Sequence, residues 1–277
     1  MRLAFSTLAC PDWSWSEAIR AARSYGYEGI EWRTIDGQLV TPSLPNDTAR
    51  AIASAMRSEG LETCALDASV QMALGPGEER QKAVQEVLEM LEVARALDAG
   101  FLRVFIGKYP PQTPDATAIR WVADGLAEAL PKASALGIGI ALEVHSFEGR
   151  GKNVNGTSDS TLCRQVVEAC ASPSLGILWD VGNPYLEEEP LSETWGNVKG
   201  HLLYLHVKDQ KRLADGAWKY VLNGEGDVDL ARMAALLRGQ RFTGWLSYEW
   251  EKKWHPELAD PGVALPHYVS AMRALLK

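Results

Sequence analysis

Short apolar segments alternate with longer segments of helical periodicity along the chain. The helical pattern is clearest over 78–98, where Val84, Val87, Leu88 and Leu91 form one apolar stripe. Short apolar or alternating runs predict strands near 3–8, 29–34, 63–68, 101–106, 138–144, 175–180, 201–207 and 244–250. Between and after them the pattern predicts helices near 14–25, 46–59, 78–98, 115–136, 158–171, 192–199, 229–238 and 265–276.

Eight strand–helix units follow one another without a linker or a shift in composition. Alternating units of this kind indicate parallel strands with helices outside them, and eight units favour a single α/β domain over 1–277, a (β/α)₈ TIM barrel. An open, doubly wound sheet is the alternative. The segment after the first strand, TLACPDWSW, lacks the Gly-rich dinucleotide fingerprint that often accompanies such a sheet.

In a barrel of this type the chemistry lies at the carboxyl ends of the strands and in the loops that follow them. Three such segments are long: SFEGRGKNVNGT after strand five, DQKRLADGAWKYVLNGEGDVD after strand seven and WEKKWHPELADPG after strand eight. The turns from helix to strand, such as LGIG, are short. We therefore expect the active side of the protein at the carboxyl ends of the strands.

Polar residues close four consecutive predicted strands: Glu143, Asp180, His206 and Glu249. If the apolar neighbours of these residues face the helices, strand alternation turns all four towards the barrel interior. A single strand-end carboxylate is more often a helix cap or an ion-pair partner, but three close together raise one another's pKa unless a cation is present. The sequence therefore predicts one divalent metal ion bound by these four residues. Their oxygen-rich donor set favours Mn²⁺, with Mg²⁺ or Co²⁺ possible and Zn²⁺ less favoured.

The same alternation turns His145 and Lys208 towards the interior. Both are candidate substrate contacts. For Lys208 an ion pair with Asp209 or Glu251 is an equally good interpretation.

Composition and charge exclude several classes of function. The chain is 46% hydrophobic and 23% charged with a net charge of −8, so nucleic acid is not an expected partner. No apolar run of about 18 residues predicts a membrane span. The four cysteines form no C-x-x-C pair, which is typical of reduced thiols in a cytoplasmic protein.

Five stretches occur in an order and spacing that resemble the xylose-isomerase-like TIM-barrel superfamily: ALEVHS, ILWDVGN, LLYLHVKD, NGEGDVD and WLSYEWE. This group includes sugar isomerases and epimerases, myo-inosose dehydratases, hydroxypyruvate isomerases and type IV endonucleases. The likeness covers essentially the whole chain and is nearest to the ketose 3-epimerases. It implies the same four metal ligands, a small sugar substrate and a homodimer or homotetramer.

The resemblance also implies a mechanism. In the ketose 3-epimerases the two glutamates that correspond to Glu143 and Glu249 act as acid and base. One removes the proton beside the carbonyl and the other returns a proton on the opposite face, while the metal stabilises the enediolate. Arg212, six residues after the metal-binding histidine, matches a substrate-binding arginine, and Glu148 matches a further substrate contact once a gap is allowed.

One position departs from the epimerase pattern. Three residues after Asp180 these epimerases usually have His, and here the residue is Asn183. Its amide can donate a hydrogen bond to substrate but cannot take a proton at neutral pH. Two alternatives therefore stay open: a lyase on the same scaffold, such as a keto-inositol dehydratase or a bond-cleaving enzyme, and a binding subunit with reduced catalysis. The type IV endonucleases need a His-rich site, whereas this chain is acidic and has five His in all.

Overall fold

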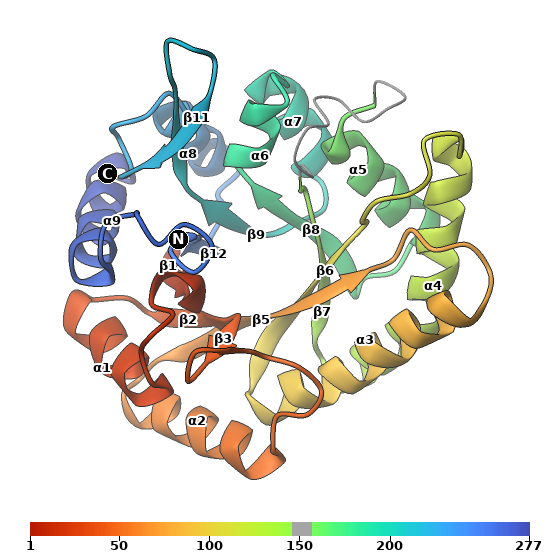
Figure 1. Ribbon diagram of the computed structural model, residues 1–277, viewed down its shortest axis with the longest axis horizontal. Coiled ribbons are helices and arrows are strands. Elements are labelled where there is room, and N and C mark those ends of the chain that lie inside the picture. Colours follow the sequence, from red (N-terminus) through yellow and green to blue (C-terminus); the bar gives the residue numbers. More distant parts are fainter. Residues whose placement is uncertain (146–156) are drawn as a thin grey trace.

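The computed structural model describes residues 1–145 and 157–277 (Figure 1). Eight parallel strands close a barrel in the order β1-β12-β9-β8-β7-β6-β5-β2, with β2 pairing to β1. The bounds are β1 (Arg2–Ser6), β2 (Gly29–Trp32), β5 (Glu62–Gln71), β6 (Ala99–Phe105), β7 (Gly139–Glu143), β8 (Leu175–Asp180), β9 (Leu202–Val207) and β12 (Trp245–Tyr248). The predicted (β/α)₈ barrel is thus confirmed.

Helices surround the strands (Figure 1). They are α1 (Trp15–Tyr25), α2 (Asn46–Ser58), α3 (Glu78–Ala96), α4 (Asp115–Leu136), α5 (Asp159–Cys170), α7 (Leu191–Val198), α8 (Leu230–Gly239) and α9 (Pro261–Leu275). Local signals set several ends. Ser14 and Glu17 form a capping box at the start of α1, and Gly26 ends that helix in the left-handed conformation at φ 85°. No helix in the described part of the chain is long and apolar enough to cross a membrane.

The structure contains short elements that the periodicity did not predict. They are η1 (Thr7–Ala9), β3 (Thr34–Ile35), β4 (Gln38–Leu39), α6 (Gly182–Leu186), β10 (Asp209–Arg212) and β11 (Trp218–Val221). The pairs β3–β4 and β10–β11 are antiparallel hairpins in loops that follow barrel strands. The last helix begins at Pro261 rather than near 265, because proline is well suited to the first helical position.

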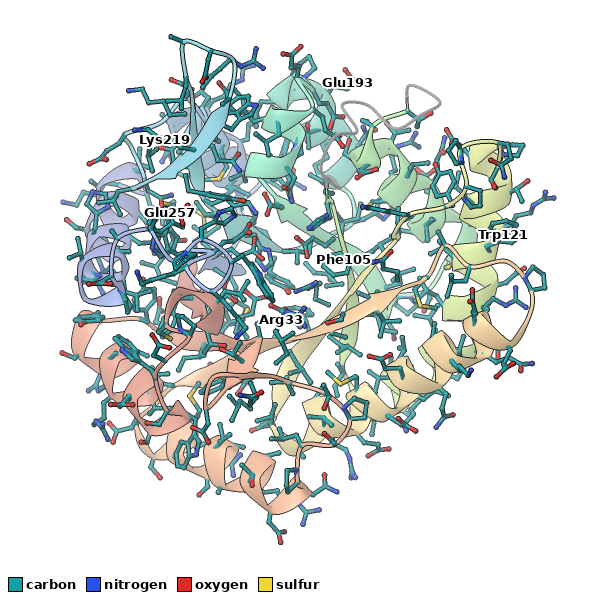
Figure 2. All side chains as sticks on the ribbon, in the orientation of Figure 1. Arg33, Phe105, Trp121, Glu193, Lys219 and Glu257 are labelled. Carbon is teal, nitrogen blue, oxygen red and sulfur yellow. The ribbon has the colours of Figure 1, made fainter. Side chains whose placement is uncertain are left out.

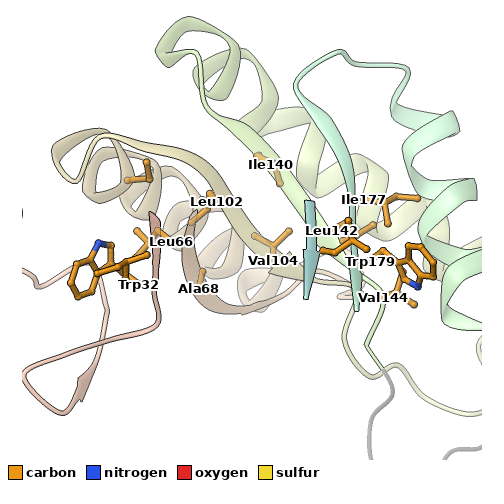
Figure 3. Close-up of a cluster of buried hydrophobic side chains, with 14 of the residues drawn as sticks. Trp32, Leu66, Ala68, Leu102, Val104, Ile140, Leu142, Val144, Ile177 and Trp179 are labelled. Atoms are coloured by element: carbon orange, nitrogen blue, oxygen red, sulfur yellow. The ribbon is translucent and has the colours of Figure 1, made fainter. Parts of the chain in front are cut away.

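The strand side chains form two layers, as the alternation predicted. Outward-facing side chains such as Leu102, Leu142 and Val144 pack in the apolar layer between strands and helices (Figure 3). A second apolar cluster inside the barrel consists of Ala4, Cys64, Ala65, Ala141, Leu178, Tyr204 and Trp245, with Phe101 and Leu203 packed against it. Beyond this cluster, towards the carboxyl ends of the strands, most inward positions carry polar or charged side chains, such as Asp67, Arg103 and Glu143.

Candidate metal centre

The structure brings the four predicted ligands together. Glu143 ends β7, Asp180 ends β8, His206 lies in β9 and Glu249 directly follows β12. One ligand atom from each residue lies within 4.8 Å of the others, and none of the four side chains is more than 6% exposed. Buried carboxylates at this separation need positive charge to compensate them.

The orientation of the His206 ring indicates where a cation would bind. Its Nε2 lies 2.9 Å from Glu31 Oε1, so a proton on Nε2 is donated across the barrel and Nδ1 is the ring nitrogen left to bind a metal. Nδ1 makes no hydrogen bond among the described residues, yet it lies 3.2 Å from Glu249 Oε1, 3.6 Å from Glu143 Oε1 and 3.9 Å from Asp180 Oδ2. An imidazole nitrogen facing three carboxylate oxygens fits a divalent cation between them, which would take the place of the Nδ1 proton.

Glu31 supports this histidine and was missed by the sequence interpretation. Its Oε1 also accepts a hydrogen bond of 2.7 Å from the Tyr204 hydroxyl, and its Oε2 accepts one from the Ser247 hydroxyl. A carboxylate that fixes the ring of a metal-binding histidine orients the ligand and sets its tautomer. The available signal was a charged residue at an inward position of the apolar strand GIEW.

Arg103 on β6 and Asp67 on β5 were also missed. Arg103 Nε lies 3.2 Å from Glu143 Oε2, and its Nη2 lies 3.5 Å from Asp67 Oδ2. Burial alone would raise the pKa of Glu143, but the charges of Arg103 and His206 outweigh it and hold that pKa below its ordinary value. Glu143 is therefore ionised at neutral pH.

Lys208 makes the ion pair with Glu251 rather than the one with Asp209. Its Nζ lies 2.8 Å from Glu251 Oε1, 2.7 Å from Glu249 Oε2 and 2.8 Å from Asp180 Oδ2. Burial opposes the charged amine, yet these three carboxylates raise the pKa of Lys208 well above its ordinary value. Burial and the neighbouring carboxylates raise the pKa of Asp180 to about 7, despite Lys208. The lysine is thus a fixed positive charge beside the cluster.

Asp209 binds the backbone of a loop and does not pair with Lys208. Its buried carboxylate accepts backbone N–H groups from Gln210 at 2.9 Å, Gly224 at 2.8 Å, Gly226 at 3.0 Å and Val228 at 3.3 Å. These bonds tie the NGEGDVD stretch to the end of β9. Part of the family-like sequence therefore holds a loop in place and does not contact the metal cluster.

We expect Asp209→Ala to lower the free energy of unfolding by about 2 kcal/mol, because buried N–H groups would lose their acceptor. Urea unfolding followed by circular dichroism measures this loss. Asp215→Ala is the matched control, since Asp215 is exposed and accepts one hydrogen bond from Ala217 in the tip of the β10–β11 hairpin. Equal stability of the two variants would contradict the assigned role of Asp209.

Two other predicted substrate contacts lie close to the ligands. The Asn183 backbone N–H donates to Asp180 Oδ1 at 2.9 Å, and its side-chain amide donates to the Val144 carbonyl at 3.3 Å. The His145 ring packs edge-on against Phe105 with the ring centroids 4.8 Å apart, and burial is the main cause that lowers its pKa. Asn183 thus joins the start of α6 to the end of β7.

The remaining two predicted contacts lie elsewhere. Arg212 lies on β10 with 45% of its side chain exposed. Its Nη2 lies 2.6 Å from Glu188 Oε1, and its guanidinium carbon lies 4.7 Å from the centroid of the Trp218 ring. The structure therefore places Arg212 on the hairpin and not in the metal cluster. Glu148 lies outside the described residues.

Known proteins resemble this chain in sequence. A family model described as xylose isomerase-like TIM barrel matches residues 19–269. Fructoselysine 3-epimerase from Escherichia coli O157:H7 is 21% identical over 238 residues, which cover 84% of this chain and 84% of that protein.

Solved structures are similar over the whole length. The IolI protein with a bound zinc atom has a TM-score of 0.82 at 18% identity and covers 100% of this chain and 98% of its own. The probable 3-DHS dehydratase AsbF of Bacillus anthracis has a TM-score of 0.78 at 14% identity and covers 99% of each chain. D-psicose 3-epimerase of Clostridium cellulolyticum H10, with D-tagatose, has a TM-score of 0.78 at 13% identity and covers 100% of each chain. At these identities the likeness establishes a shared fold.

Proposed function

The chain belongs to the xylose isomerase-like TIM-barrel family, and we propose that it is a divalent-metal-dependent isomerase or epimerase of a ketose or keto-sugar derivative. The observation that carries this proposal is the placement of Glu143 and Glu249. They come from β7 and from the end of β12, which β8 and β9 separate in the barrel, yet both lie within 4 Å of the same imidazole nitrogen. In the proposed reaction these two carboxylates flank one substrate carbon.

The protonation states suit removal of a proton beside a carbonyl. Burial would raise the pKa of Glu249, but His206 and Lys208 outweigh burial and hold that pKa well below its ordinary value. Glu143 is ionised as well. A base must be in its ionised form and within reach of the proton that it takes. In the proposed reaction one ionised glutamate removes the proton beside the carbonyl, and the other, after taking a proton from solvent, returns it on the opposite face. Arg212, His145, Asn183, Lys208 and Glu148 remain the proposed substrate contacts.

Glu143, Asp180, His206 and Glu249 would hold the metal. When bound, a divalent cation supplies a Lewis acid that stabilises negative charge developing on substrate oxygens. Three carboxylates and one imidazole favour Mn²⁺, with Mg²⁺ or Co²⁺ next. Because the structure of IolI holds a zinc atom, Zn²⁺ is the ion to compare with Mn²⁺ in metal titrations.

Solvent exchange tests the reaction. Metal-loaded protein is incubated in D₂O with a panel of ketoses and keto-sugar derivatives, and the products are followed by NMR and mass spectrometry. We expect deuterium at the carbon beside the carbonyl together with an isomer or epimer of equal unlabelled mass. Loss of water after exchange would instead indicate a dehydratase, which starts with the same proton removal. Binding without exchange would indicate a subunit without turnover.

A further inference from the structure

Arg33 is a buried cation whose hydrogen bonds go to neutral groups. It directly follows β2, two positions after Glu31, and only 7% of it is exposed. Its Nη1 donates to the Asp67 carbonyl oxygen at 3.1 Å and its Nη2 to the Ser69 hydroxyl at 2.8 Å. Both acceptors are neutral, and among the described residues no carboxylate forms an ion pair with this guanidinium.

The other buried cations of the barrel differ from Arg33 in this respect. Arg103 pairs with two carboxylates and Lys208 with three. Burial lowers the pKa of Arg33 to about 10 and repulsion from Arg103 adds to this effect, although attraction to Asp67, Glu143 and Glu249 partly offsets it, so the side chain stays charged at neutral pH. A buried charge with no counter-ion in direct contact is costly, which points to a partner that arrives from outside the chain.

The strand order places this charge opposite the metal cluster. The ligands come from β7, β8, β9 and β12, which are neighbours in the barrel, whereas β2 belongs to the other arc, formed by β1, β2, β5 and β6 (Figure 1). Arg33 lies towards the middle of the molecule (Figure 2). Arg33 therefore lies on the arc of the barrel that faces the metal cluster.

We propose that Arg33 binds an anionic group of the substrate, so that the site takes an acidic keto-sugar, with a carboxylate or a phosphate distant from the reacting carbonyl. The inference rests on the function proposed above for the same site. A guanidinium offers five N–H donors in a planar fork that matches a carboxylate or a phosphate. Two of them are used by Asp67 and Ser69.

Binding to matched ligands tests this proposal without requiring turnover. D-Fructose, D-fructuronate and D-fructose 6-phosphate share their ketose end and differ only at C6, which is neutral, carboxylated or phosphorylated. Calorimetric titration of the Mn²⁺-loaded protein should show at least one charged ligand binding about 10- to 100-fold more tightly than D-fructose. The preferred ligand distinguishes a carboxylate from a phosphate.

Arg33→Gln should remove this preference and leave the affinity for D-fructose within about twofold, whereas Arg33→Lys should keep part of it. Arg57→Gln is the matched control, because Arg57 is exposed on α2 and pairs with Asp98. Equal affinity of the wild-type protein for all three ligands would overturn the proposal. An equal loss of affinity for all three ligands in Arg33→Gln would also overturn it, because Arg33 would then only balance the negative charge of the carboxylates in the barrel.

The two proposals fail separately. Arg33-dependent binding of a charged ligand without deuterium exchange would leave the anion site in place and reject the isomerase. Deuterium exchange on D-fructose with no preference for charged ligands would support the isomerase and reject the anion site. If Arg33→Gln does not fold, competition between D-fructose 6-phosphate and inorganic phosphate on the wild-type protein decides the matter. Failure of phosphate to compete would count against Arg33.

Discussion

Replacing Glu143 or Glu249 with Gln should slow deuterium exchange at the substrate carbon by about 10²–10⁴-fold, the contribution of a general base. Glutamine keeps the shape and one oxygen for the metal but cannot take a proton at neutral pH. The loss should appear mainly in kcat, because proton transfer belongs to the transition state. Exchange is measured on the panel member that the wild-type protein labels, at saturating metal.

Glu92→Gln is the matched control for these variants. Glu92 lies on the outer helix α3, 2.9 Å from Lys132, and should leave exchange unchanged. Metal content of each variant is measured in parallel, so that loss of base is separated from loss of metal. Wild-type kcat in both Gln variants with metal bound would reject the mechanism. The proton would then have to move through another group, with Lys208 and His145 as the first candidates.

Glu31→Gln should weaken metal binding by about 10- to 100-fold, although Glu31 bonds to the His206 nitrogen that points away from the other three proposed ligands. A metal bound at this site would have to displace a proton from His206, because the charges of Glu249 and Glu31 outweigh burial and raise the pKa of that ring well above 6.5 in the metal-free protein. Apparent affinity should therefore rise with pH up to that pKa. The Kd is obtained by chelator competition at several pH values.

Ser247→Ala is the graded comparison for Glu31, since its hydroxyl donates to Glu31 and, among the described residues, forms no hydrogen bond with the four proposed ligands. We expect a loss of affinity below about tenfold. A Glu31→Gln protein with wild-type Kd and an unchanged pH profile would show that this carboxylate does not set the histidine tautomer. A merely structural role for Glu31 would lower stability and leave the pH profile of metal binding as it was.

The alternation of apolar and polar residues was enough to predict the barrel and the convergence of the four residues proposed as metal ligands. Leu142 and Val144 face the helices, so Glu143 between them must face inward, and the same argument holds for His206 between Leu205 and Val207. Side-chain direction in a strand is a local property with a period of two residues. In parallel neighbouring strands the carboxyl ends meet at one side of the barrel, so strand-end residues far apart in sequence become neighbours.

Contacts across the barrel could not be predicted in this way. Glu31 reaches His206 over 175 positions of sequence, and strands β1 and β12 lie between their strands. Which inward side chains meet across the interior depends on the register and closure of all eight strands, which no single stretch of sequence encodes. The same holds for Lys208, whose partner among nearby carboxylates was open until Glu251 was placed beside it.

The sequence by itself therefore determined the fold, the end of the barrel at which its polar residues meet and the four residues that face one another there, because these follow from local periodicity and strand order. Only the tertiary structure decided which charges are compensated. It pairs Arg103 and Lys208 with carboxylates and leaves Arg33 with two neutral acceptors. The physical reason is that charge compensation depends on distances of a few ångströms between strands, and those distances exist only once the barrel has closed.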